Sequence, residues 1–170
     1  MSLTFVAGAA ADVFAADLAV SVESELQSRY SFTAGPAEDP YRSEPVNPAG
    51  WRELQNLIRS MLGTGAAPHF TSVDAYQAVY IPAAVAGVDQ VALPNAADPL
   101  QVSSLEALIA ELTRFAEQAQ LPTDDLALMQ LAADYMEADV DRELDFQTYV
   151  QLMLSAKQAV ARGQALWIVT

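Results

Sequence analysis

The chain has 170 residues, no cysteine, and a formal net charge of −14 from 22 acidic and 8 basic side chains. This length predicts a single domain, residues 1–170, that can bury a core without needing a cross-link. The lack of cysteine excludes disulfides, thiolate metal sites and a cysteine nucleophile, and it fits a cytoplasmic protein. The negative field repels phosphate groups, so we expect no binding to nucleic acid or to anionic membranes.

The negative charge comes mainly from a shortage of basic residues. Charged side chains make up 18% of the chain, against about 25% in an average soluble domain. Lys157 is the single lysine beside seven arginines, a composition typical of a high-GC bacterial genome. No basic residue precedes Arg29 and no uncharged apolar run is long enough to cross a bilayer, so neither a secretory signal nor a membrane span is expected.

In the first half of the chain, apolar periodicity and turn residues predict the elements. Residues 2–7 are rich in strand formers, and alanine-rich residues 10–30 favour a helix. Residues 31–50 contain four prolines and are interpreted as a proline-rich loop, either a binding loop or an ordinary surface excursion. Residues 51–62 place their apolar side chains on one helical face. We therefore expect a strand, a helix, a long loop and a second helix in that order.

The second half is predicted to begin with a hairpin, residues 75–93, built from strands at 75–81 and 88–93. Helices are expected at 102–119, 123–136 and 146–162, the second apolar around most of its circumference and so central or buried on two faces. A strand at 165–169 closes the chain. The predicted fold class is α+β, with a small, mainly antiparallel sheet made of the N-terminal strand, the hairpin and the C-terminal strand, covered by about five helices.

The densest chemical feature is a run of carboxylates in residues 134–145, offset only by Arg142. If one helix ran through this segment, a wall of four carboxylates would share a face: Asp134, Glu137, Asp141 and Asp145. Such a wall could bind a divalent cation through oxygen ligands or contact a basic partner. The alternative is a solvated connection between helices, with Asp145 as an N-cap.

Three further residues are candidates for binding. His69 is the only histidine and so the only side chain that could serve as the base of a Ser-His-Asp device, although no serine lies in a nucleophile-elbow motif. Tyr76 and Tyr80 are an even number of positions apart, so on a strand they would share a face and could line a pocket. Core packing is the alternative for both tyrosines.

These observations favour a non-enzymatic interaction protein. The analogy is with immunity proteins and nuclease inhibitors, and it rests on composition alone. A carboxylate-based divalent-metal enzyme and a small-molecule binding module are the alternatives. No cofactor is expected. The apolar composition and the predicted helix at 123–136 also favour a homo-oligomer.

Overall fold

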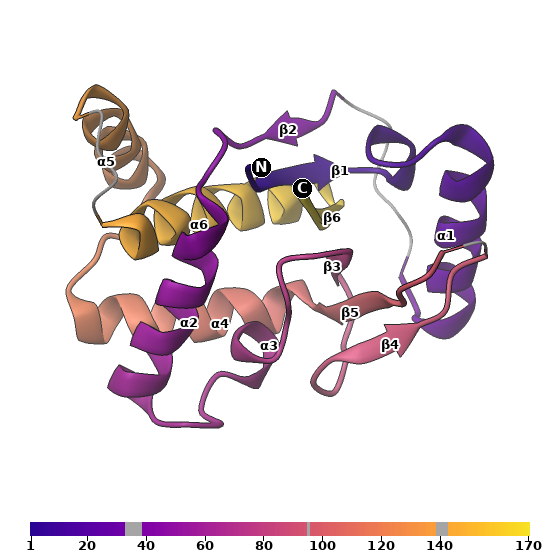
Figure 1. Ribbon diagram of the computed structural model, residues 1–170, viewed down its shortest axis with the longest axis horizontal. Coiled ribbons are helices and arrows are strands. Elements are labelled where there is room, and N and C mark those ends of the chain that lie inside the picture. Colours follow the sequence, from indigo (N-terminus) through magenta and orange to yellow (C-terminus); the bar gives the residue numbers. More distant parts are fainter. Residues whose placement is uncertain (33–38, 95, 139–142) are drawn as a thin grey trace.

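The computed structural model describes residues 1–32, 39–94, 96–138 and 143–170 (Figure 1). The strands are β1 (Thr4–Gly8), β2 (Tyr41–Arg42), β3 (Ala78–Ile81), β4 (Asp89–Val91), β5 (Leu100–Ser104) and β6 (Ala165–Val169). The helices are the 3-10 turn η1 (Ala10–Asp12), α1 (Ala16–Arg29), α2 (Pro48–Leu62), α3 (Pro68–Thr71), α4 (Leu105–Ala119), α5 (Asp125–Glu137) and α6 (Leu144–Arg162).

The strands form one six-stranded sheet in the order β2-β1-β6-β3-β5-β4. Only β3 and β5 are parallel, and the other neighbouring pairs are antiparallel. The predicted α+β class, with a mainly antiparallel sheet, is therefore confirmed. The expected C-terminal strand coincides with β6, which pairs with β1 along its whole length and brings the two ends of the chain side by side (Figure 1).

The predicted hairpin over residues 75–93 is wrong, although strands form at both of its ends. β5 lies between β3 and β4, pairing parallel with the first and antiparallel with the second. All four residues of β3 are buried, so this strand needs a neighbour on each side. Asp89 and Gln90 leave β4 largely exposed, which suits the edge of the sheet. The predicted helix at 102–119 accordingly begins only at Leu105.

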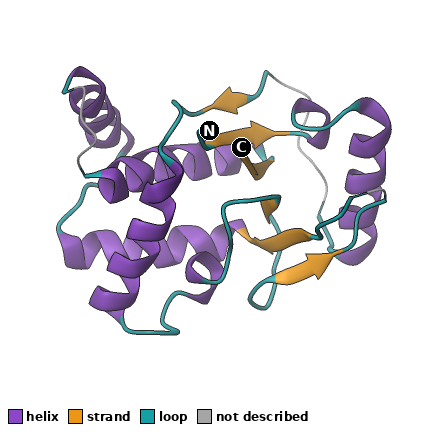
Figure 2. Ribbon diagram, viewed as in Figure 1, coloured by secondary structure: helices purple, strands orange, loops and turns teal. Residues whose placement is uncertain are grey.

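The sheet separates two apolar layers, because alternate side chains of β1, β3 and β6 face opposite sides. On one side, strand residues such as Phe5 and Tyr80 pack against helices α2, α4 and α6. On the other side, residues such as Val79 and Trp167 are covered by α1. In Figure 2, α1 lies to the right of the strands and the larger helical layer lies to their left. Burial on both faces explains why these strands read as continuous apolar runs.

Helix α6 is the central helix, with ten buried residues between Thr148 and Ala159. The start of α2 crosses it at Gly50, where a Cβ atom would collide with the Leu144 carbonyl and the Thr148 hydroxyl. Gly163 ends α6 in the left-handed conformation. Within the described residues, no helix is long and apolar enough to span a bilayer.

The described part of the expected proline-rich loop, residues 31–50, pairs with β1. Tyr41 and Arg42 form β2, Ser43 exchanges hydrogen bonds with the backbone of Phe5, and Val46 bridges to Leu3. Pro48 already belongs to α2, whose N-cap is Asn47. The described part of this segment thus extends the sheet and lies beside the helical layer.

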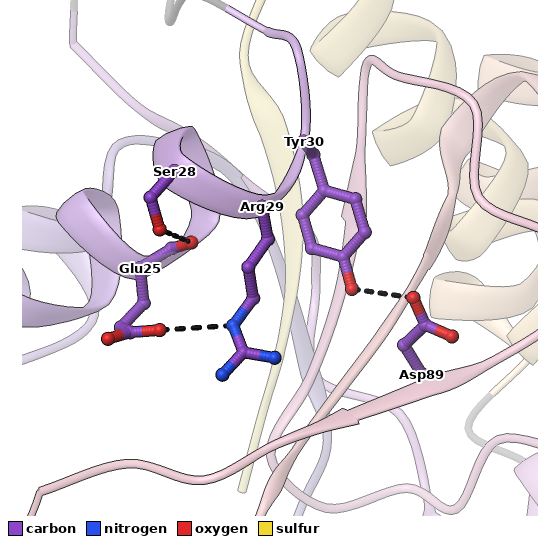
Figure 3. Close-up of polar contacts among 5 residues, drawn as sticks. All are labelled: Glu25, Ser28, Arg29, Tyr30 and Asp89. Atoms are coloured by element: carbon purple, nitrogen blue, oxygen red, sulfur yellow. Dashed lines mark hydrogen bonds and ion pairs between the residues drawn. The ribbon is translucent and has the colours of Figure 1, made fainter.

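Helix α1 is tied to the opposite sheet edge by a side-chain bridge (Figure 3). The Tyr30 hydroxyl donates to Asp89 of β4 over 2.8 Å. Burial raises the pKa of Tyr30 to about 12, with the hydrogen bond to Asp89 as the next cause. Arg29 and Glu25 form an exposed ion pair at 3.0 Å on the adjoining turn. The Tyr30–Asp89 hydrogen bond therefore holds the last turn of α1 over β4.

Candidate functional site

Helix α5 lies outside the main body of the fold and packs against α6 (Figure 1). Asp124 caps its N-terminus by accepting a hydrogen bond from the backbone of Ala127. Lys157 of α6 donates to the Thr123 carbonyl and forms an ion pair with Asp125. The Tyr149 hydroxyl donates to the Pro122 carbonyl over 2.8 Å. The beginning of α5 is therefore fixed to α6 by polar contacts.

The expectation that this helix is central, or buried on two faces, is wrong. Leu128 is its only buried residue, and Tyr135 is half-buried against the core. By contrast, Leu126 is 79% exposed, Met129 53% and Met136 62%. Apolar side chains do cover most of the circumference, but only the inner side has a partner within the described chain. The outer side is an apolar surface without a covering element.

The exposed apolar residues of α5 follow a regular spacing. Leu126, Met129, Ala133 and Met136 are separated by three, four and three positions, which places them in one stripe along the helix. We call these four residues the outer stripe. Its spacing matches the apolar seam of a paired helix, and Ala133 leaves a gap between larger neighbours. The outer stripe can therefore accept the side chains of a second helix.

The predicted wall of four carboxylates on one continuous helix does not form. α5 ends at Glu137, and α6 begins at Leu144 with a different axis (Figure 1). Asp134 and Glu137 lie exposed in the last turn of α5, where Asp134 accepts a hydrogen bond from Gln130. Asp141 lies outside the described residues. Asp145 is in the first turn of α6 and is not its N-cap, which is Glu143.

Acidic side chains lie at the end of α5 and at the start of α6, and two of those at the start of α6 act on Tyr135 of α5. Burial, followed by the charges of Glu143 and Asp145, raises the pKa of Tyr135 to about 12. The last turn of α5 contains no basic residue. Carboxylates in this turn are unfavourable, because they lie at the negative end of the helix dipole. Asp134 and Glu137 thus place negative charge in the last turn of α5, at the C-terminal end of the outer stripe.

A hollow of about 240 Å³ adjoins the same end of α5. It lies between α5, α6 and the segment that follows β2, and Met136 forms part of its wall. Its lining residues are Glu44, Pro45, Val46, Ala132, Tyr135, Met136, Gln147 and Gln151. The hollow is large enough to receive a side chain from a bound partner.

Among the described residues, no three or more histidine, cysteine, aspartate or glutamate side chains are grouped to hold a metal ion. Asp134 and Glu137 are exposed on α5. Asp145 lies in the first turn of α6 instead, and its Oδ1 accepts a hydrogen bond from the Phe146 backbone N–H. The described carboxylates thus form a diffuse negative surface.

His69 and Tyr80 belong to one hydrogen-bond network that holds α3 in place. The Ser103 hydroxyl donates to the Gly87 carbonyl over 2.7 Å, so its remaining contact at 2.8 Å receives the Nδ1 hydrogen of His69. Tyr80 is fully buried and donates to the His69 carbonyl. With its single hydrogen committed to a carbonyl, the buried Ser103 is not presented to His69 as a nucleophile.

Glu111 completes this network. Its carboxylate oxygens accept hydrogen bonds from the backbone N–H groups of His69 and Phe70, at 3.0 and 2.9 Å. Burial raises the pKa of Glu111, and the two N–H groups offset part of that rise. These hydrogen bonds fix the first turn of α3 to α4. His69 and Glu111 therefore both have a structural role.

Tyr76 and Tyr80 do not share a face as expected. Tyr76 precedes β3, and Gln77 between them has a φ of +41°, which interrupts the extended alternation. Tyr76 is 61% exposed and lies between two open hollows of about 310 and 320 Å³, both of which also contact Asp74. These hollows could receive a small polar ligand, but Tyr80 contributes nothing to them.

Three features of the α5 site were not predicted: the exposure of the outer stripe, the anchoring by Lys157, and the hollow beside Met136. The three-four-three spacing was readable in the sequence, but the same helix carries a second apolar set on its inner side. Spacing alone does not show which set lacks a partner. Comparison of the chain with protein-family models, with curated protein sequences and with solved structures finds no match.

Proposed function

We propose that this protein is a non-enzymatic interaction protein that binds another protein through the outer face of α5. The single observation that carries the proposal is the outer stripe, three of whose residues are more than half exposed. Large apolar side chains aligned on one exposed helix are unfavourable in water and mark contact surfaces. A cytoplasmic location is part of the proposal and is supported by the lack of cysteine.

A second argument comes from the charges at the end of α5. Asp134 and Glu137 occupy the last turn of α5, which itself contains no basic residue, an arrangement that weakens an isolated helix. Local features that oppose stability are expected where function requires them. A partner that covers the apolar side chains and supplies positive charge would relieve both unfavourable features.

The test is capture of partners from a lysate of the source organism by three immobilised proteins: the wild type, a Met129→Glu/Met136→Glu variant, and a Val20→Glu control. Val20 is 71% exposed on α1, far from α5 (Figure 1). A protein retained by the wild type and the control is purified and its affinity is measured directly. We expect the double variant to weaken binding at least about tenfold, because buried anchor residues dominate interfaces.

Thermal unfolding of each variant checks that the fold is intact, since both substituted methionines are exposed. Equal binding by the double variant and the wild type would contradict the proposal. So would the absence of any protein retained by the wild type in excess over the double variant.

A further inference from the structure

We infer, on the basis of the proposed function, that the partner contributes an amphipathic helix whose apolar seam is flanked by lysine or arginine and lies along α5. The outer stripe sets the shape of this contact. Its three-four-three spacing is that of a helix seam, in which side chains of one helix enter spaces on the other. α5 contains 13 residues, so the contact would extend over about 20 Å.

The side chains of the outer stripe favour a helix over a flat surface. Ala133 forms a gap between Met129 and Met136, which suits an inserted leucine or isoleucine. Methionine side chains adapt to irregular partners. The hollow of about 240 Å³ beside Met136 provides a second position for a large side chain. A ridge with a gap and a terminal hollow is complementary to a row of regularly spaced side chains.

The charges on α5 indicate which residues should flank the apolar seam of the partner helix. From its cap to its last turn, α5 carries Asp124, Asp125, Asp134 and Glu137 and no basic residue. Lys157 of α6 offsets Asp125 at the beginning of the helix. The C-terminal half, near Glu143 and Asp145, has no such offset among the described ion pairs. Basic residues of the partner are therefore expected beside this half.

The same charges disfavour a second copy of this chain as the occupant. In an antiparallel pair of α5 helices, the acidic end of each would face Asp124 and Asp125 of the other, where Lys157 offsets Asp125 and no described ion pair offsets Asp124. In a parallel pair, Asp134 and Glu137 would face their own copies. Either arrangement places like charges at a shared seam, which opposes pairing.

The experiment uses the full chain and three synthetic helical peptides with the same length. The first has leucine at the seam and lysine at the flanks, the second has leucine with glutamate at the flanks, and the third has serine at the seam with lysine at the flanks. Binding is measured by fluorescence anisotropy at low and at physiological salt. We expect the first peptide to bind at least about tenfold more tightly than either other peptide, and its affinity to fall as salt rises.

Met129→Glu/Met136→Glu should abolish this binding, whereas Val20→Glu should preserve it. Equal binding of the lysine and glutamate peptides would overturn the inference, as would binding of the serine peptide. Sedimentation that shows a dimer of the wild type and a monomer of the methionine variant would also overturn it, in favour of a second copy. If capture from lysate depends on α5 while the peptides fail, only the partner class is wrong; if capture does not depend on α5, the proposed function itself fails.

Discussion

Glu111 is a buried carboxylate that supports the fold through two backbone contacts. Nothing in its sequence context distinguishes it from the other glutamates of amphipathic helices, since its role depends on α3 folding back onto α4. The same is true of His69, whose isolation in the sequence suggested a base. In the structure it is one member of a network with Ser103 and Glu111. Residue type alone could not separate these roles, because Ser103 and Glu111 lie 34 and 42 positions from His69.

Replacing Glu111 with glutamine tests this network. A neutral amide can accept only one of the two N–H groups, so we expect a loss of about 1–3 kcal/mol in the free energy of unfolding. The folded pKa is raised above the ordinary 4.5, so the wild-type contribution is full below that pH and declines as pH rises through the raised pKa. The difference between wild type and Glu111→Gln should therefore be larger at about pH 4 than at about pH 7. Denaturant unfolding at both pH values measures it, and a difference that grows with pH would contradict this account.

At the scale of elements, regular periodicity predicted α2, α6 and β6 well, because each has a single pattern and a clear end signal. The segment at 100–119 was harder to predict, since Leu100–Ser104 continues directly into the amphipathic pattern of α4. A strand at 100–104 is indicated only by the need of the buried strand β3 for a second neighbouring strand. α5 presents the related difficulty of two apolar sets on one helix. Which set faces the core depends on the position of α6, and local sequence contains no information about it.

Leu128 tests how α5 is attached. It is the only buried residue of α5, and its replacement by alanine removes the main apolar contact with the core. We expect faster hydrogen exchange across α5 with little change in β3 and β6, because α5 packs outside the sheet layers. Leu126→Ala is the control, since that side chain is exposed and should leave exchange unchanged. Uniform acceleration throughout the protein, or an equal effect of both variants, would show that α5 is integral to the core.

At the scale of the whole molecule, composition predicted an acidic α+β protein but not where its acidity matters. The net charge is spread over the chain, whereas the structure places Asp134 and Glu137 in the last turn of an exposed apolar helix and Glu143 and Asp145 at the start of the next helix. The carboxylate run at 134–145 is the densest acidic segment of the sequence. Its interpretation as a wall on one helix failed, because α5 ends at Glu137 and α6 begins at Leu144. What remains is a combination of charge and apolar surface that a basic, apolar partner would complement.

Reversing the charges beside the outer stripe tests this account most directly. The Asp134→Lys/Glu137→Lys variant is titrated with the lysine-flanked and glutamate-flanked leucine peptides. Asp17→Lys/Glu53→Lys is the matched control, because it changes the net charge equally at exposed positions on α1 and α2. The account predicts that the α5 variant prefers the glutamate-flanked peptide while the control keeps the wild-type preference for lysine. An unchanged preference in the α5 variant, or the same shift in both variants, would contradict it.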